Sequence, residues 1–204
     1  MKLYEDTPYW PIVLTALHTG MRRSESLGLR WRDIDLDLGT VSVRQVMHRL
    51  GTGEFIFDRP KTAKSRRLIP LGATIILALK QHRIEEMAKA QLIGWSNSDE
   101  SQVFTRLDGS SMLPDTLSHQ FIKRARAAGF DGLTFHALRH THATWMLQQD
   151  IHPKIVQERL GHASMSTTLD TYSHVVPGLQ QAAAVQFDTL IQKASIKTEP
   201  VLAH

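Results

Sequence analysis

The stretch from His136 to Tyr172 constrains this chain most strongly, because it gathers cations, hydrogen-bond donors and one tyrosine within 37 residues. His136 and Arg139 lie three residues apart, a spacing that places two side chains on one face of a helix. Leu160-Gly161-His162 follows, and its glycine is typical of a helix that ends in a left-handed cap. Together these groups suit an oxyanion with an attacking oxygen beside it, which is what phosphoryl transfer requires.

Each of these motifs has an ordinary explanation when it is taken alone. His136 and Arg139 also fit a surface or capping pair, and Tyr172 also fits a packed aromatic side chain. The order and spacing of the three motifs favour a shared site over three coincidences.

The three motifs resemble the C-terminal signature of the tyrosine recombinases, the integrase family of phages and mobile elements. In that family the signature reads roughly H-x-L-R-H, then L-G-H, then a tyrosine usually followed by x-H. The matching residues here are His136, Leu138, Arg139, His140, Leu160, Gly161, His162, Tyr172 and His174. The resemblance covers the chain from about Tyr9 to Gly178.

An earlier segment resembles the first arginine motif of the same family. Residues 9–20 are expected to form a helix, with Pro11 in its first turn and Gly20 at its end. Arg22, three residues after Thr19, matches the catalytic arginine of the motif, and Glu25 would be its buried acidic partner. From the residues alone, this run fits equally a helix start that presents Arg22 to an anion.

Residues 40 to 70 change from helical to strand-like periodicity. We expect three short antiparallel strands, at about 40–48, 54–58 and 66–70. The basic run between the last two fits a solvated hairpin tip. The resemblance instead assigns Lys61 as the general acid that protonates the leaving 5′ oxygen, with Lys64 as the alternative.

The remaining segments predict a mainly helical α+β domain with a small three-stranded antiparallel sheet. Helices are expected at about 72–93, 114–128, 136–149 and 153–160. The catalytic domain should span residues 1–178, followed by a last helix at 179–194 and a loose tail at 195–204. In the family that last helix often docks on a neighbouring protomer, and a core-binding domain that this chain lacks usually precedes the catalytic domain.

Composition limits the remaining classes of function. The 204 residues carry a formal charge of +4, which permits a local nucleic-acid-binding face without requiring one. The absence of cysteine excludes disulfides and thiolate metal sites. No apolar run is long enough for a transmembrane helix, and the first residues do not form a signal peptide.

The resemblance implies a mechanism without metal, ATP or any other cofactor. Arg22 and Arg139 would clamp the scissile phosphate, His136 would act as acid or base, and Tyr172 would attack. His162 would hydrogen-bond a non-bridging oxygen, and Glu25 and His140 would support the set. Contacts to DNA phosphates are expected from the basic side chains of Lys64, Arg66, Lys123 and Arg124.

The same resemblance implies partners and a location. These are double-stranded DNA attachment sites, a homotetramer on DNA, an excisionase or host DNA-bending factor, no membrane, and a bacterial cytoplasm. An isolated domain of this kind is expected to be a monomer.

Three rival interpretations stay open at this point. The chain could be a DNA-binding regulator with inactive chemistry, or a metal-dependent hydrolase using His136, His140 and His142. It could also be a type IB topoisomerase, which shares the chemistry but acts as a monomer without exchanging partners. The Leu160-Gly161-His162 motif and the last helix favour the integrases.

Overall fold

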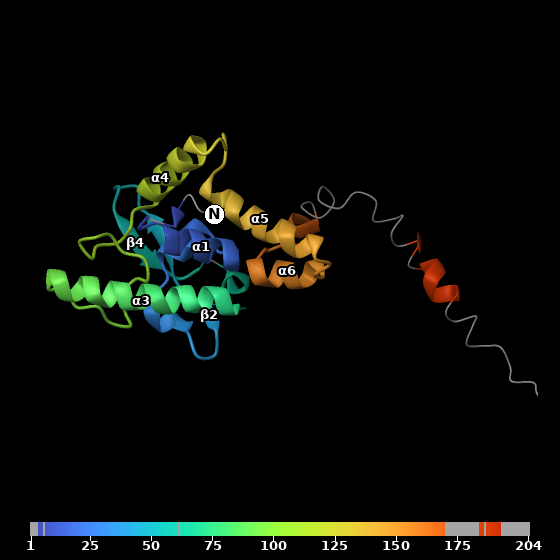
Figure 1. The fold of residues 1–204 in the computed structure, drawn as a ribbon, viewed down its shortest axis with the longest axis horizontal. Coiled ribbons are helices and arrows are strands. Elements are labelled where there is room, and N and C mark those ends of the chain that lie inside the picture. The colour runs from blue at the N-terminus through green and yellow to red at the C-terminus, as the bar shows by residue number, and fades with distance from the viewer. Residues whose placement is uncertain (1–3, 6, 61, 170–183, 186, 193–204) are drawn as a thin grey trace, which may run out of the picture.

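A computed structural model of the chain describes residues 4–5, 7–60, 62–169, 184–185 and 187–192. Within them, six helices carry most of the fold (Figure 1). They are α1 (Trp10–Thr19), α2 (Arg23–Leu27), α3 (Ala73–Ile93), α4 (Pro114–Ala127), α5 (Phe135–Gln148) and α6 (Pro153–Leu160). The helices predicted at about 9–20, 72–93, 114–128, 136–149 and 153–160 are therefore confirmed to within a few residues at each end.

Proline marks the beginning and glycine the end of two helices, α1 and α6. Pro11 and Pro153 occupy the first turns of α1 and α6, where a missing N–H costs nothing. Gly20 and Gly161 cap the other ends of these helices with φ of 66° each. That left-handed conformation is one that glycine adopts without steric cost.

Among the described residues, five short strands form two separate antiparallel sheets. The first sheet has the order β1-β2-β5, with β1 (Ile34–Asp35), β2 (Thr40–Val43) and β5 (Arg67–Pro70). Its register pairs Val41 with Ile69, and both side chains are fully buried. The second sheet is a hairpin of β3 (Val46–Arg49) and β4 (Phe55–Asp58).

The prediction of a single strand at 40–48 is wrong, because residues 44–45 interrupt it and separate β2 from β3. The break follows from a close approach of α2: a Cβ on Gly28 would lie 2.9 Å from both Gln45 O and Val46 Cα. Gln45 Nε2 also donates to Gly28 O at 3.2 Å. The end of α2 therefore holds the backbone at residue 45 and directs β3 away from the first sheet.

One large core lies where α1 packs against both α3 and α5. Figure 1 shows α3 and α4 on opposite sides of α1. Ile12 and Ala16 of α1 are fully buried there, and Trp31, in a short 3₁₀ helix after α2, is 2% exposed. A second, smaller cluster joins α5 to α6 through Ala143, Leu147, Val156 and Leu160.

Two helices bury only part of their apolar residues, and the prediction that Trp145 belongs to the core is wrong. On α3, Ile75 and Leu79 are buried, but Ile84, Met87 and Leu92 are exposed in the part of the chain that the structure describes. On α5, Leu147 is buried, whereas Trp145 is 55% exposed. The apolar pattern of both helices is thus broader than the face that packs.

The expected last helix is described only in part. Residues 184–185 and 187–192 are helical, and the described side chains there are exposed. The rest of the predicted 179–194 segment and the 195–204 tail lie outside the described residues.

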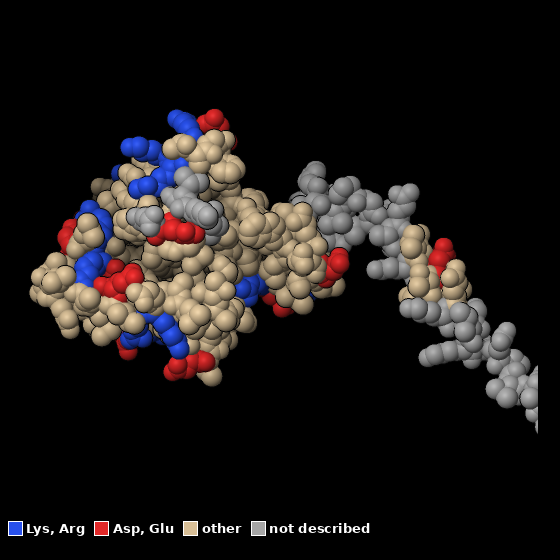
Figure 2. Space-filling view, in the orientation of Figure 1, with Lys and Arg blue, Asp and Glu red and all other residues tan. Residues whose placement is uncertain are grey.

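The surface carries both signs of charge. Figure 2 shows Lys and Arg intermixed with Asp and Glu on the face that it presents. Within the described ranges, no helix is long and apolar enough to cross a membrane.

Candidate active site

Arg22 stands at the start of α2, in extended conformation just before the first helical residue. Its backbone N–H donates to Glu25 Oε2 at 2.8 Å, and its Nη1 donates to Glu25 Oε1 at 2.7 Å. Its Nη2 reaches Gly161 O, 3.2 Å away at the end of α6. One arginine therefore links two segments that lie far apart in the sequence.

Glu25 is 2% exposed and holds a second arginine as well. Arg67, on β5, donates to it through Nη1 at 3.1 Å and Nη2 at 2.9 Å, which is a bidentate pair. Burial of the Glu25 carboxyl opposes its ionisation, but the hydrogen bonds and charge of Arg67, with those of Arg22, outweigh it and lower its pKa. A carboxylate is thus fixed between two guanidinium groups.

Arg139 enters the same region from α5. Its Nη1 donates to Gly20 O at 2.8 Å, and its side chain is almost fully buried. Its Nη2 is buried as well and has no hydrogen-bond partner among the described residues. Burial and the neighbouring charge of Arg22 lower the pKa of Arg139 to about 9, so the guanidinium stays charged at neutral pH.

His136 and His140 lie on the exposed side of α5, with ring centroids 4.8 Å apart in an edge-to-face arrangement. Burial, His140 and the charges of Arg139 and Arg22 lower the pKa of His136 below its ordinary value. These influences favour the neutral form of the His136 ring.

His162 follows the glycine cap of α6. Its Nδ1 lies 2.8 Å from the Oγ1 of Thr168, a fully buried residue. Burial and the charges of Arg139, Arg22 and Arg67 lower the pKa of His162 to about 4. The ring is neutral at pH 7, so when Thr168 donates to Nδ1, the Nε2–H is the ring's own donor.

The other predicted site residues divide into four groups, one of which is Arg66, an exposed side chain just before β5. Lys61 and Tyr172 lie outside the described residues. Lys64 Nζ donates to Ala163 O at 2.8 Å, so this lysine lies beside the loop that follows His162. Lys123 and Arg124 lie on α4, where Arg124 stands over the ring of Tyr9.

Arg67 was not singled out from the sequence, although a signal for it exists. It lies two residues before the buried Ile69 on β5, so both side chains face the same side of the strand. An arginine on the inward face of a strand needs a partner, and Glu25 is that partner here.

Arg159 was also missed. It donates to His142 Nε2 at 3.1 Å, to Pro70 O at 3.0 Å and to His18 O at 3.0 Å. Arg159 therefore joins α6 to β5 and to α1.

The alternative of a histidine metal site does not fit this geometry. His142 is buried, with Nδ1 2.8 Å from Leu17 O and Nε2 occupied by Arg159. Within the described residues, no group of three or more His, Asp or Glu side chains is placed to hold a metal ion.

A cluster of three arginines and two histidines on a mainly helical domain has the charge and the donors to bind a phosphate group. The family model described as the phage integrase family matches residues 5–178, and the chain belongs to that family. The fold class predicted from the sequence and the family resemblance are therefore confirmed.

Relatives with curated descriptions agree with this assignment. The chain is 33% identical over 177 residues to a XerC-like tyrosine recombinase of Caldanaerobacter subterraneus subsp. tengcongensis, covering 81% of this chain and 45% of that protein. It is 28% identical over 176 residues to the ICEBs1 integrase of Bacillus subtilis, covering 86% and 47%. The chain thus spans about half the length of the curated relatives it matches.

Solved structures share the fold. The integrase of transposon Tn1549, in complex with transposon right end DNA, matches with a TM-score of 0.76 at 23% identity, over 93% of this chain and 62% of that one. The XerH recombinase in a pre-cleavage complex with difH substrate matches with a TM-score of 0.58 at 27% identity, over 86% and 46%.

Proposed function

We propose that this chain is the catalytic domain of a site-specific DNA recombinase that cuts and rejoins strands through a phosphotyrosine bond. One observation carries the proposal: Arg22 and Arg67 share the single carboxylate of Glu25, and the buried Arg139 lies close enough to feel the charges of all three. The cluster therefore keeps an excess of positive charge at a partly buried place. A phosphodiester is the kind of anion that such a cluster binds.

Arg22 and Arg139 are the proposed phosphate clamp. Arg22 is partly exposed at 36%, and Arg139 keeps Nη2 without a partner among the described residues. Each guanidinium has donors left for a non-bridging oxygen, and such charge-assisted bonds grow stronger as negative charge develops in the transition state. Arg67 has fewer donors left, because its Nε is held by Arg159 O at 2.6 Å.

Tyr172 is the proposed nucleophile. His136 would take the proton of its hydroxyl, and the phenolate would attack phosphorus to form a 3′-phosphotyrosine bond. The bond from phosphorus to the 5′ oxygen would break, and Lys61 would protonate that oxygen. Because the new ester keeps the phosphate activated, a 5′ hydroxyl from another strand can reverse the step without ATP.

The remaining groups would hold the phosphate and position the clamp. His162 would donate from its free ring nitrogen to a non-bridging oxygen, and Thr168 would fix the tautomer that makes this donation possible. Glu25 would orient Arg22, and His140 would keep the His136 ring in place through their edge-to-face contact.

We extend the proposal to partners by analogy with the relatives. Neighbouring structures include integrases and recombinases bound to DNA, which supports duplex attachment sites as the substrate. Four protomers on two duplexes, integration or excision of a mobile element, and assistance from an excisionase or bending factor follow from the family. Work on a bacterial chromosome would place the protein in the cytoplasm.

The test uses a nicked suicide duplex built from the sequence that flanks the gene, with EDTA present. A covalent protein–DNA band that maps to Tyr172 by mass spectrometry, and that disappears in Tyr172→Phe, is the expected result. Tyr9→Phe is the matched control, because it removes a hydroxyl from a tyrosine whose ring lies against Arg124 of α4.

Two other outcomes have distinct meanings. An adduct that forms only after the chain is fused to the N-terminal half of a relative would show that stable DNA binding requires residues outside this domain. Absence of an adduct from both forms, with DNA binding retained, would favour the rival regulator with inactive chemistry.

A further inference from the structure

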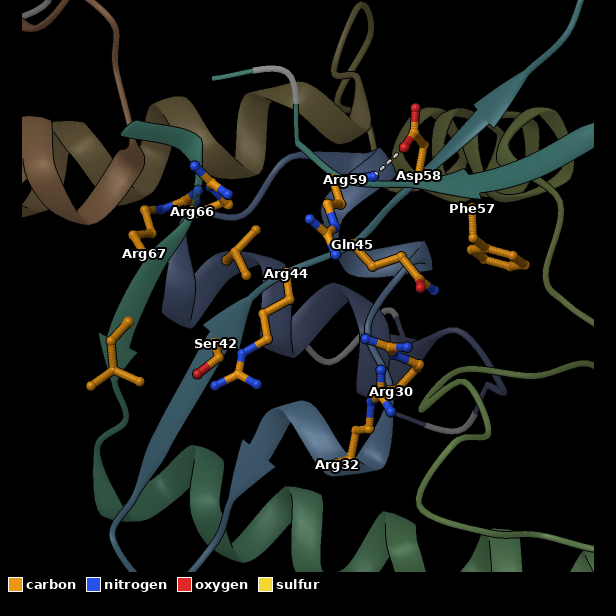
Figure 3. Close-up of a pocket in the computed structure, with 12 residues that line it drawn as sticks. Arg30, Arg32, Ser42, Arg44, Gln45, Phe57, Asp58, Arg59, Arg66 and Arg67 are labelled. Carbon is orange, nitrogen blue, oxygen red and sulfur yellow. Dashed lines mark hydrogen bonds between the residues drawn. The ribbon is translucent and has the colours of Figure 1, made fainter. Parts of the chain in front are cut away.

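A second basic hollow lies beside the candidate active site, on the outer face of the first sheet. It has a volume of about 770 Å³ and opens between β2, β4 and the start of β5. Figure 3 shows arginine side chains entering it from several sides. We call it the arginine pocket, and its arginines are Arg30, Arg32, Arg44, Arg59, Arg66 and Arg67.

Three of these six arginines are already neutralised. Arg30 pairs with Asp33, Arg32 with Glu100, and Arg67 with Glu25. These pairs form the wall of the pocket and reduce the charge that the three arginines offer to a ligand.

The other three arginines have free charges. The side chains of Arg44, Arg59 and Arg66 are exposed and make no hydrogen bond or ion pair with any described residue. The single acid of the lining, Asp58, already accepts the backbone N–H of Arg59 at 2.6 Å. The pocket therefore carries a net positive charge that only an outside anion can balance.

An aromatic ring stands at the edge of the same pocket. Phe57, on β4, is 37% exposed, and Leu68 on β5 is 59% exposed. Proteins that bind single-stranded nucleic acids combine basic side chains for the backbone with aromatic rings on which bases stack. A duplex would offer phosphates to the arginines but no free base to Phe57, because its bases are stacked inside.

The arginine pocket also adjoins the proposed active site. A smaller cavity of about 280 Å³ contains His162 and Gly161, and Arg66 and Arg67 line both hollows. A strand released at the active site would therefore meet the arginine pocket directly across β5.

We propose that the arginine pocket binds a short unpaired DNA strand, with phosphates on Arg44, Arg59 and Arg66 and one base stacked on Phe57. This inference rests on the proposed function, in which the strand that ends in the freed 5′ hydroxyl must leave its complement before it is rejoined. The pocket holds that strand beside His162, across the residues Arg66 and Arg67 that line both hollows, while the exchange takes place.

The test measures binding of a fluorescent twelve-nucleotide oligothymidylate and of a twelve-base-pair duplex to the full chain by anisotropy. Arg44→Gln with Arg59→Gln should weaken oligothymidylate binding about tenfold or more. It should also lower the slope of log K against log salt by about 1.4, since each single-strand phosphate contact contributes roughly 0.7. Phe57→Leu should weaken oligothymidylate binding about tenfold with an unchanged salt slope.

The control is Arg83→Gln with Arg106→Gln, which removes two arginines on α3 and the loop after it. It should leave oligothymidylate binding within about twofold of the wild type. Thermal unfolding of every variant checks that the fold is kept.

Several results would overturn the proposal. A loss of duplex binding with unchanged oligothymidylate binding would make the pocket a duplex contact, and equal losses in the control pair would make the effect non-specific. Displacement of the oligothymidylate by an oligoglutamate of equal charge, with no effect of Phe57→Leu, would remove the nucleic-acid assignment.

The outcome is separable from that of the proposed function. A Tyr172 adduct on the suicide duplex without oligothymidylate binding would reject the arginine pocket alone. Oligothymidylate binding without any adduct would reject the recombinase chemistry alone.

Discussion

At the scale of single residues, one carboxylate supports two guanidinium groups. Glu25→Gln keeps the size of the side chain but leaves the charges of Arg22 and Arg67 without compensation. We expect the free energy of unfolding to fall by about 3 kcal/mol, in the range for breaking a buried pair by removing one partner. Urea unfolding measures it, and the exposed Glu54→Gln should change stability by less than about 0.5 kcal/mol.

Arg67 should act on cleavage through its neighbours. Arg67→Lys keeps the charge but loses the bidentate pair with Glu25, and so loosens Arg22. We expect the rate of adduct formation at saturating DNA to fall about tenfold, which is about 1.4 kcal/mol, with DNA affinity little changed. Partial recovery of that rate by free guanidinium in Arg67→Ala would show positioning, and an unchanged rate in Arg67→Lys would contradict it.

Two histidines should make stability depend on pH. The pKa values of His142 and His162 are lowered to about 4 in the fold, in both cases first by burial. The unfolded chain, with a histidine pKa near 6.5, binds more protons between these values, so stability should fall as pH drops from about 6.5 to 4. Imidazole NMR titration should show two rings still neutral at pH 5, and His162→Asn should flatten the pH dependence of unfolding.

At the scale of elements, the glycine that ends α6 adopts a left-handed conformation and also lies close to neighbouring atoms. The glycine that ends α3 has the same conformation without close neighbours, so comparing the two separates these effects. Gly161 and Gly94 both end a helix in left-handed conformation, with φ of 66° and 67°. A Cβ on Gly161 would lie 3.0 Å from Arg67 Nη1 and from Lys64 O, whereas a Cβ on Gly94 would meet nothing within 4 Å.

Alanine at the two caps should therefore have different effects. Gly94→Ala should cost about 1 kcal/mol, from backbone strain alone. Gly161→Ala should cost about 2 kcal/mol or more and slow cleavage, since it pushes on Arg67 and on the segment that carries His162. If Gly94→Ala and Gly161→Ala lose the same stability in thermal unfolding, the side chain of Arg67 moves aside without cost and this prediction is wrong.

The helices could be predicted from the sequence because their ends are marked locally. Pro11, Gly20, Pro153 and Gly161 act on their own backbone, so no knowledge of the tertiary structure was needed. The break between β2 and β3 could not be predicted, because it depends on Gly28, which approaches from a different helix.

The candidate site was predictable where a motif carries it and not elsewhere. Arg22, Arg139 and His162 each stand in a recognisable run of residues. Arg67 acquires its importance only when β5 comes beside α2, and Arg44 and Arg59 only when β2 and β4 enclose a hollow. Such relations arise from the packing of elements that are distant in the sequence.

At the scale of the whole molecule, the two hydrophobic clusters differ greatly in size. The large cluster includes α1, whereas α6 is held by a cluster of four buried residues. We expect α6 to open with a lower free energy than α1, since local stability follows the apolar contacts of each region. Native-state hydrogen exchange should show α1 amides protected to near the global free energy of unfolding and α6 amides less so. Equal protection of both would contradict this.

The contacts of Arg22 with Gly161, Arg67 with Glu25, and Arg139 with Gly20 have a consequence for biosynthesis. They join positions separated by 139, 42 and 119 residues in the chain. A nascent chain on the ribosome that has not yet released α5 and α6 can pair Arg22 and Arg67 with Glu25, but it lacks Arg139 and the contact of Arg22 with Gly161. Under the proposed function, the chain would acquire its phosphate-binding site only after α5 and α6 have left the ribosome.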